Sequence, residues 1–227
     1  MIARLVEALI PHELRRTFRR VCWVGDAPEL PEAPVVLYAN HHYFYDGYLL
    51  WLLTRRVLDR PGLTWMADWD RFPFFAAAGA QPFPPDNPAR RRATLRRTAH
   101  HFRTRPDTVL VYFPEGVLHA PENGILPFPP RAFDRLARLF PTAWWWPVAL
   151  HVTWWGDARP TALLTGGAPH AAPDGSEHAR LERLWHALRR ERPTPTTTLM
   201  EGRRSPSETW SFSLARRFFE RYLPPHA

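Results

Sequence analysis

The sequence predicts a single α/β domain in which a mostly parallel central sheet is flanked by helices. Short runs rich in β-branched and aromatic residues alternate along the chain with longer segments whose apolar residues recur at helical spacing. Polar motifs follow directly after two of these runs, which are expected to end at Ala39 and Phe113. Ligands of open α/β sheets bind outside the carboxyl ends of strands, so both motifs should lie along one edge. At 227 residues, the chain is long enough to bury a core.

The first 25 residues are predicted to form amphipathic helices. Apolar residues recur with a spacing of three and four at Ile2, Leu5, Val6, Leu9 and Ile10. Pro11 is expected to interrupt this helix and to open a second one, with Leu14 and Phe18 on a shared face. Two interpretations stay open for residues 1–25: helices packed on the core, or a membrane-surface anchor whose arginines face anionic headgroups.

The remaining elements follow from periodicity and capping residues. Expected strands cover residues 34–39, 64–69, 108–113, 147–155 and 160–165. Expected helices cover residues 47–58, 87–103, 131–140, a segment around 181–188, and a C-terminal helix at 205–224. Asn87 followed by Pro88 is an N-cap with proline at the first helical position, and Ser205 with Glu208 forms a capping box. Residues 71–86 are expected as a loop or a broken helix, and residues 192–206 as a loop.

The amino-acid composition excludes some kinds of functional site and favours some kinds of binding partner. All 30 basic residues are arginine, which excludes a phosphate-loop lysine and a Schiff-base lysine, and the formal charge of +8 favours an anionic partner. The single Cys22 excludes an internal disulfide and a cysteine-rich metal site. No apolar run reaches about 18 residues, so no transmembrane helix is expected. The 11 Trp and 14 Phe beside these arginines suit a membrane interface, and equally a single-stranded nucleic acid.

The first motif is NHHYFYD, residues 40–46. A histidine can accept a proton from a hydroxyl when a carboxylate fixes its second ring nitrogen, as in the histidine–aspartate half of a serine triad. Asp46 directly precedes an apolar helix and should lie near its start, which favours His41 over His42 as its partner. The alternative is a loop histidine capped by an aspartate, without chemistry.

The chain offers a base but no obvious nucleophile. Its five serines all lie from Ser176 onward, and no G-x-S-x-G motif occurs. The nucleophile would then be a substrate hydroxyl attacking an activated carbonyl such as a thioester. The second motif, FPEG at residues 113–116, turns the chain at the end of a strand and presents a carboxylate. Glu115 could accept a hydrogen bond from a substrate hydroxyl, or could simply be a turn carboxylate in solvent.

The two motifs together, in this order and about 70 residues apart, resemble the glycerolipid acyltransferase superfamily of the 1-acylglycerol-3-phosphate acyltransferase (PlsC-like) type. The segment 147–150 lies where that family has its fourth, proline-containing block. The resemblance covers roughly residues 33–165 of a single domain spanning 1–227.

The resemblance implies an O-acyltransferase in which His41 is the general base and Asp46 orients it. The activated acceptor hydroxyl attacks the thioester of acyl-CoA or acyl carrier protein, which serves as co-substrate, and no metal or bound cofactor is expected. Glu115 and Gly116 would hold the acceptor. The implied substrate-binding residues are Asn40, Pro114, Glu115, Gly116 and Arg131. The expected location is peripheral, on the cytoplasmic face of an anionic membrane.

Two departures from the family pattern concern the acceptor. The family follows Glu-Gly with a small hydroxyl residue and an arginine, where this chain has Val117 and Leu118. Its second block carries another arginine, where this chain has residues 84–87. Both arginines are associated with the phosphate of the acceptor in that family, and the candidate substitutes in this chain are Arg90 to Arg92, His119 and Arg131. The acceptor is therefore expected to be a lysophospholipid such as 1-acylglycerol-3-phosphate, or alternatively a non-phosphorylated glycosylated or isoprenoid lipid.

Two rival functions remain. A non-catalytic basic module would bind anionic membranes or single-stranded nucleic acid independently of His41, although no nucleic-acid-binding motif is found and no such partner is expected. A thioesterase would use His41 to activate water. His151, inside the apolar run 147–155, is interpreted as a structural histidine.

Overall fold

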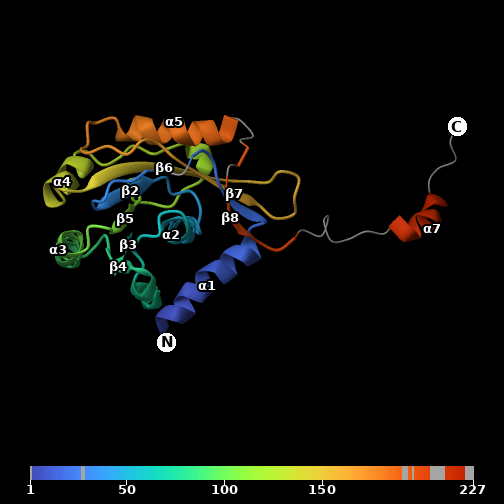
Figure 1. Cartoon of the computed structure of the whole chain (residues 1–227), viewed down its shortest axis with the longest axis horizontal. Coiled ribbons are helices and arrows are strands. Elements are labelled where there is room, and N and C mark those ends of the chain that lie inside the picture. The colour runs from blue at the N-terminus through green and yellow to red at the C-terminus, as the bar shows by residue number, and fades with distance from the viewer. Residues whose placement is uncertain (1, 27–28, 191–193, 196, 205–212, 223–227) are drawn as a thin grey trace.

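The computed structural model describes residues 2–26, 29–190, 194–195, 197–204 and 213–222, and its strands form one sheet (Figure 1). The strands are β1 (Arg20–Trp23), β2 (Val35–Ala39), β3 (Gly62–Met66), β4 (Ala80–Pro82), β5 (Val109–Tyr112), β6 (Trp144–Thr153), β7 (Thr161–Gly166) and β8 (Thr197–Glu201). They lie in the order β4-β3-β5-β2-β6-β7-β1-β8. The β6–β7 and β1–β8 pairs are antiparallel and the other neighbours are parallel, so the predicted fold class is confirmed.

Helices cover both faces of this sheet. They are α1 (Ile2–Thr17), α2 (Asp46–Arg56), α3 (Pro88–Thr104), α4 (Ala132–Leu139) and α5 (Glu177–Arg190). The described residues also form the helix α7 (Arg216–Glu220) and the 3₁₀ turns η1 (Pro73–Ala78), η2 (Pro121–Asn123) and η3 (Ser213–Ala215). Side chains of α1 and α2, such as Leu14 and Leu53, pack in one core cluster, whereas those of α3, α4 and α5, such as Phe102, Phe133 and Trp185, pack in the other. In Figure 1, α5 lies along the top of the sheet, and α1 lies toward the bottom.

The central strand β2 is buried along its whole length, because β5 and β6 flank it and helices cover both faces. A strand covered on both faces is a continuous apolar run rather than an alternating one, as in VVLYA. All three strands run parallel, so their carboxyl ends meet at one edge. The segments after Ala39 and Tyr112 are therefore neighbours in space.

The N-terminal segment differs from the prediction, because α1 is one helix that continues through Pro11. Proline removes one helical hydrogen bond, but burial of a continuous face compensates. That face holds Val6, Ile10 and Leu14, at a spacing of four residues. Leu5 and Leu9, on the adjacent face, are 70 % and 36 % exposed. No helix within the described residues is long and apolar enough to cross a bilayer.

Three strands were not predicted: β1, β4 and β8. β1 lies inside the segment expected to be helical, and β8 lies in the segment 192–206 expected as a loop. Both are short and polar in part, and they form because β1 pairs with β7 on one side and β8 on the other. β4 follows η1 in the Pro-rich segment 71–86 and pairs with β3. Of the predicted C-terminal helix, residues 205–212 and 223–224 lie outside the described residues.

We predict that Leu14→Ala lowers the free energy of unfolding by about 2–5 kcal/mol, because it removes most of a fully buried side chain and leaves a cavity in the core. Leu5→Ala in the same helix is the matched control, and it should change stability by less than about 0.5 kcal/mol because Leu5 is exposed. Urea denaturation followed by circular dichroism measures both. Equal effects of the two substitutions would show that α1 does not pack as described.

Candidate active site

The chain leaves β2 through a tight turn that Asp46 holds together. Asp46 is the first residue of α2, and its side chain is buried. Its Oδ2 accepts hydrogen bonds from the backbone N–H groups of His42 (2.7 Å) and Tyr43 (2.9 Å). The N-terminus of a helix favours a negative charge, so α2 also stabilises the ionised carboxylate. The turn therefore places a fixed, charged acceptor beneath residues 41–43.

His41 contacts the same carboxylate oxygen through its ring. Nδ1 lies 3.1 Å from Asp46 Oδ2, and because an ionised carboxylate only accepts, Nδ1 carries the proton. In the neutral ring, Nε2 then has a free lone pair, and no hydrogen bond occupies it among the described residues. The ring stacks on Phe113, with centroids 4.2 Å apart and planes 18° from parallel. The side chain is 23 % exposed, so a substrate can reach it.

His42 has different partners. Its backbone contacts Asp46, whereas its ring lies between Asn40 Nδ2, 3.1 Å from Nδ1, and the carbonyl of Gly124, 3.0 Å from Nε2. Burial lowers the pKa of His42, although Glu115 opposes this shift. The ring therefore stays neutral near pH 7 and links two loops.

Asn40 is a buried support rather than an exposed substrate contact. Its Oδ1 accepts from the backbone N–H of Leu150 (2.8 Å), and its Nδ2 donates to the carbonyl of the same residue (3.0 Å). This paired contact ties the end of β2 to β6 and fixes the orientation of the amide. Asn40 Nδ2 must then donate to Nδ1 of His42, which leaves the ring proton of His42 on Nε2.

Glu115 lies beside His41, but its side chain is fully buried. Oε1 accepts from the backbone N–H of His41 at 2.8 Å, and Oε2 accepts from the backbone N–H of Leu126 at 2.8 Å. Nε2 of His119 lies 2.5 Å from the same Oε2. Both oxygens are therefore occupied by the protein, so Glu115 joins loops in this structure.

The other predicted substrate-binding residues, Pro114, Gly116 and Arg131, differ in their exposure to solvent. Pro114 is buried, and Gly116 is exposed with a φ of +73°, a conformation that glycine adopts readily. Arg131 is exposed at the start of α4, and within the described residues no hydrogen bond or ion pair joins it to His41 or Glu115. Val117 and Leu118 are 53 % and 50 % exposed. The surface after Gly116 is thus apolar.

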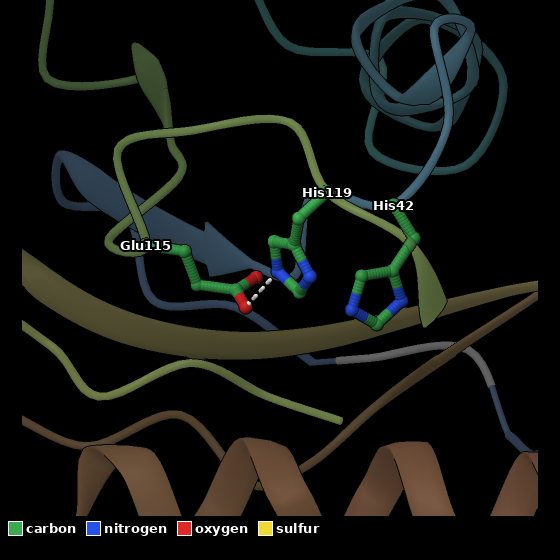
Figure 2. A group of neighbouring side chains, drawn as sticks. All are labelled: His42, Glu115 and His119. Carbon is green, nitrogen blue, oxygen red and sulfur yellow. Dashed lines mark hydrogen bonds and ion pairs between the residues drawn. The ribbon is translucent and has the colours of Figure 1, made fainter. Parts of the chain in front are cut away.

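Figure 2 shows a cluster of His42, Glu115 and His119, the one group within the described residues whose side chains could hold a metal ion. One ligand atom from each residue lies within 4.8 Å of the others. Two histidines and a glutamate are a known ligand set for zinc. Whether this cluster can bind a metal ion depends on whether the ring nitrogens of its histidines have free lone pairs.

The hydrogen bonds oppose a metal at this cluster. The amide of Asn40 fixes the proton of His42 on Nε2, the nitrogen that lies against Gly124 O, and uses the lone pair of Nδ1. The 2.5 Å between His119 Nε2 and Glu115 Oε2 is shorter than two ligands on one zinc allow, because Zn–N and Zn–O bonds of about 2 Å at tetrahedral angles separate ligands by roughly 3.3 Å. A proton fits between these atoms better than a cation. Absence of a metal stays a prediction.

Sequence reasoning missed the roles of His119 and Phe113. His119 was considered only as a substitute for a phosphate-binding arginine, yet its ring contacts Glu115 and its backbone N–H donates to the carbonyl of His41 at 3.2 Å. Phe113 sets the plane of the His41 ring. The available signal was the spacing of four between Glu115 and His119.

We predict a pH dependence of stability from His151 in β6. Burial, reinforced by Arg189 and His42, lowers the pKa of His151 to about 4. Between pH 6.5 and about 4 the unfolded chain therefore binds more protons than the folded chain, so the free energy of unfolding falls as the pH falls. His151→Gln should reduce this acid destabilisation.

Urea denaturation at neutral pH and near pH 5 measures the effect for the wild type, His151→Gln and the control His100→Gln, which alters an exposed histidine of α3. The control should lose as much stability on acidification as the wild type. An equal loss in the His151 variant would contradict the prediction. Some loss should remain, because the pKa of His42 is also lowered by burial.

Comparisons with known proteins show which fold the chain shares. No protein-family model and no curated protein matches the sequence. Among solved structures, the chain is similar to PlsC, the 1-acyl-sn-glycerophosphate acyltransferase of Thermotoga maritima, with a TM-score of 0.54. The match covers 82 % of this chain and 76 % of that one, at 16 % sequence identity, so the likeness concerns the fold. The chain therefore has the fold of a PlsC-like glycerolipid acyltransferase.

Proposed function

We propose that this protein is a lipid acyltransferase in which His41 is the general base. The observation that carries the proposal is the contact between His41 Nδ1 and Asp46 Oδ2, at the carboxyl edge of the sheet in a PlsC-like fold. A carboxylate at Nδ1 sets the tautomer and stabilises the imidazolium that forms when Nε2 takes a proton. The partly exposed ring allows a substrate hydroxyl to approach.

The proposed reaction uses the position of His41 beside Asp46. Nε2 of His41 accepts the proton of the acceptor hydroxyl while the oxygen attacks the thioester carbonyl of acyl-CoA or acyl carrier protein. The new C–O bond forms, the C–S bond breaks, and the imidazolium returns its proton to the departing thiolate. The products are an ester and a free thiol. Neither a metal nor a bound cofactor takes part in this scheme.

Two classes of acceptor fit the proposal. A lysophospholipid such as 1-acylglycerol-3-phosphate is favoured by the likeness to PlsC, whose name describes that acceptor. A non-phosphorylated lipid is favoured by the local surface, because Val117 and Leu118 follow Gly116 as exposed apolar side chains. Glu115 is also fully engaged within the protein. The apolar surface suits a hydroxyl surrounded by hydrocarbon better than one next to a phosphate.

A peripheral position on an anionic membrane is part of the proposal. Exposed Phe44 contacts Tyr48, which contacts Phe75, which contacts exposed Phe74, with successive ring centroids 4.5–6.1 Å apart. The 3₁₀ turn η1, which carries Phe74, packs against α1, which exposes Leu5. Exposed apolar residues thus extend from α1 to within three positions of His41. Such a surface, on a protein with a charge of +8, suits an anionic bilayer.

We predict that His41→Gln lowers kcat by about 10²–10⁴-fold, because glutamine preserves a polar side chain but cannot accept the proton. The assay measures free thiol released from acyl-CoA with 1-acylglycerol-3-phosphate, and in parallel with monoacylglycerol as the non-phosphorylated acceptor. His100→Gln is the control and should retain full activity, because this exposed residue lies on α3.

Assays with and without an acceptor distinguish acyl transfer from thioesterase activity and from lipid binding without turnover. Thiol release that needs an acceptor supports acyl transfer, and the better of the two acceptors identifies its class. Release at the same rate without acceptor would indicate a thioesterase instead. Full activity of His41→Gln would reject His41 as the base, and lipid binding without turnover in the wild type would favour a non-catalytic module.

We further predict that the double substitution Leu5→Ser and Phe74→Ser weakens binding to phosphatidylglycerol vesicles at least about tenfold, because burying each large apolar side chain contributes about 1.5–3 kcal/mol. Leu139→Ser is the matched control, since Leu139 is 45 % exposed on α4, at the opposite face. Vesicle co-sedimentation measures both. If the control loses as much binding as the double variant, the membrane-facing surface has been assigned incorrectly.

A further inference from the structure

The segment that follows β5 holds the peptide of His41 from both sides. Glu115 Oε1 accepts the backbone N–H of His41 at 2.8 Å, and the backbone N–H of His119 donates to the carbonyl of His41 at 3.2 Å. Phe113, in the same segment, stacks on the ring of His41. Residues 113–119 therefore set both the backbone and the ring plane of the base.

The position of Glu115 depends in turn on His119. The Glu115 side chain is fully buried, and a buried carboxylate needs donors to its oxygens. Oε2 receives one from the backbone N–H of Leu126, and His119 Nε2 lies 2.5 Å from the same atom (Figure 2). His119 Nδ1 lies 3.1 Å from the carbonyl of Ala120, which can only accept, so Nδ1 carries a proton. A further proton is then shared between Nε2 and Oε2.

The loop that carries these contacts is fastened at its far end as well. His42 Nε2 donates to the carbonyl of Gly124, and His178 Nε2, on α5, donates to the carbonyl of Ile125. The ring of His119 packs edge-on against that of His42, with centroids 4.7 Å apart. His119 is thus enclosed, with a side chain 8 % exposed, and both ring nitrogens are in use. It has no free atom for a substrate.

We propose that His119 is a positioning residue for His41: its ring completes the set of donors to Glu115, and its backbone N–H holds the carbonyl of His41. This inference rests on the proposed function, because it assigns His119 an effect on turnover through the base. Without the ring donor, the buried carboxylate of Glu115 loses a partner and moves toward other donors. The peptide of His41 loses its fixed acceptor, and Nε2 is no longer held at the substrate hydroxyl.

The test compares His119→Phe, which keeps a ring but has no donor, with His119→Gln, whose amide can donate to Glu115. His100→Phe, at an exposed position of α3, is the control. His119→Phe should lower kcat up to about 100-fold, as expected for a misplaced catalytic group, with the KM for acyl-CoA nearly unchanged. His119→Gln should recover most of kcat, and His100→Phe should match the wild type.

A second readout does not depend on turnover. In ¹H–¹⁵N NMR spectra, the backbone amide proton of His41 should be shifted downfield and protected from exchange, because it donates to a carboxylate. His119→Phe should remove this shift and protection, and His119→Gln should retain them. Both variants are also compared with the wild type by thermal denaturation, so that a folding defect in His119→Phe is recognised and His119→Gln carries the comparison.

The outcomes separate the two proposals. A wild type that transfers acyl groups, together with a His119→Phe variant of unchanged kcat or unchanged His41 amide, would overturn the positioning role. Loss of kcat in both His119 variants, with the His41 amide unmoved, would overturn it too. A third outcome is that the wild type transfers no acyl group to any lipid, while the His41 amide responds to the His119 substitutions as expected. The proposed function then fails, and the structural coupling between His119 and the backbone of His41 stands.

Discussion

Parallel pairing of β2 with β5 and β6 is the constraint on which the candidate site depends. Because the three strands end at one edge, residues from three distant parts of the chain meet there: the turn after Ala39, the segment after Tyr112, and Leu150 within β6. Val35, Leu37 and Ala39 of β2 pack in one core, and Val36 and Tyr38 pack in the other. A slip by one residue would put each set into the core that is packed around the other set, and this opposes a change of register. The hydrogen bonds of the site then act between segments that the sheet has already aligned.

The site is built mainly from buried polar groups that satisfy one another. Asp46 accepts from two backbone N–H groups and the ring of His41, and Glu115 accepts from two further backbone N–H groups. Buried charges are tolerated only with such partners, and the contacts hold the network rigid because each lost contact is costly. Within the described residues, all the contacts of Asp46 are made by Oδ2, and its buried Oδ1 has no hydrogen-bond partner. The network leaves one ring, that of His41, both oriented and partly open to solvent. The proposed role of His41 as a general base needs this arrangement, in which the supporting groups are enclosed and one histidine ring is accessible.

The apolar surroundings complement this rigidity. Phe113 stacks on His41, and exposed aromatic side chains begin three residues away at Phe44. A proton transfer between a lipid hydroxyl and an imidazole gains from exclusion of water, because the electrostatic support from Asp46 is then screened less. The same apolar surface suits contact with a bilayer, so in the proposed function the entry of a lipid and the environment of His41 have a common physical origin.

The sequence by itself determined the fold class, the long helices and the central strands, because these depend on local periodicity and on continuous apolar runs. It also selected His41 as the partner of Asp46, from the position of the carboxylate at the start of α2. Only the tertiary structure decided the strands β1, β4 and β8, whose short sequences become strands by pairing with other strands of the sheet. It also decided the contacts of Glu115, Asn40 and His119. Local sequence does not reveal which loops meet at a sheet edge, and hydrogen bonds across that edge occupy both carboxylate oxygens of Glu115.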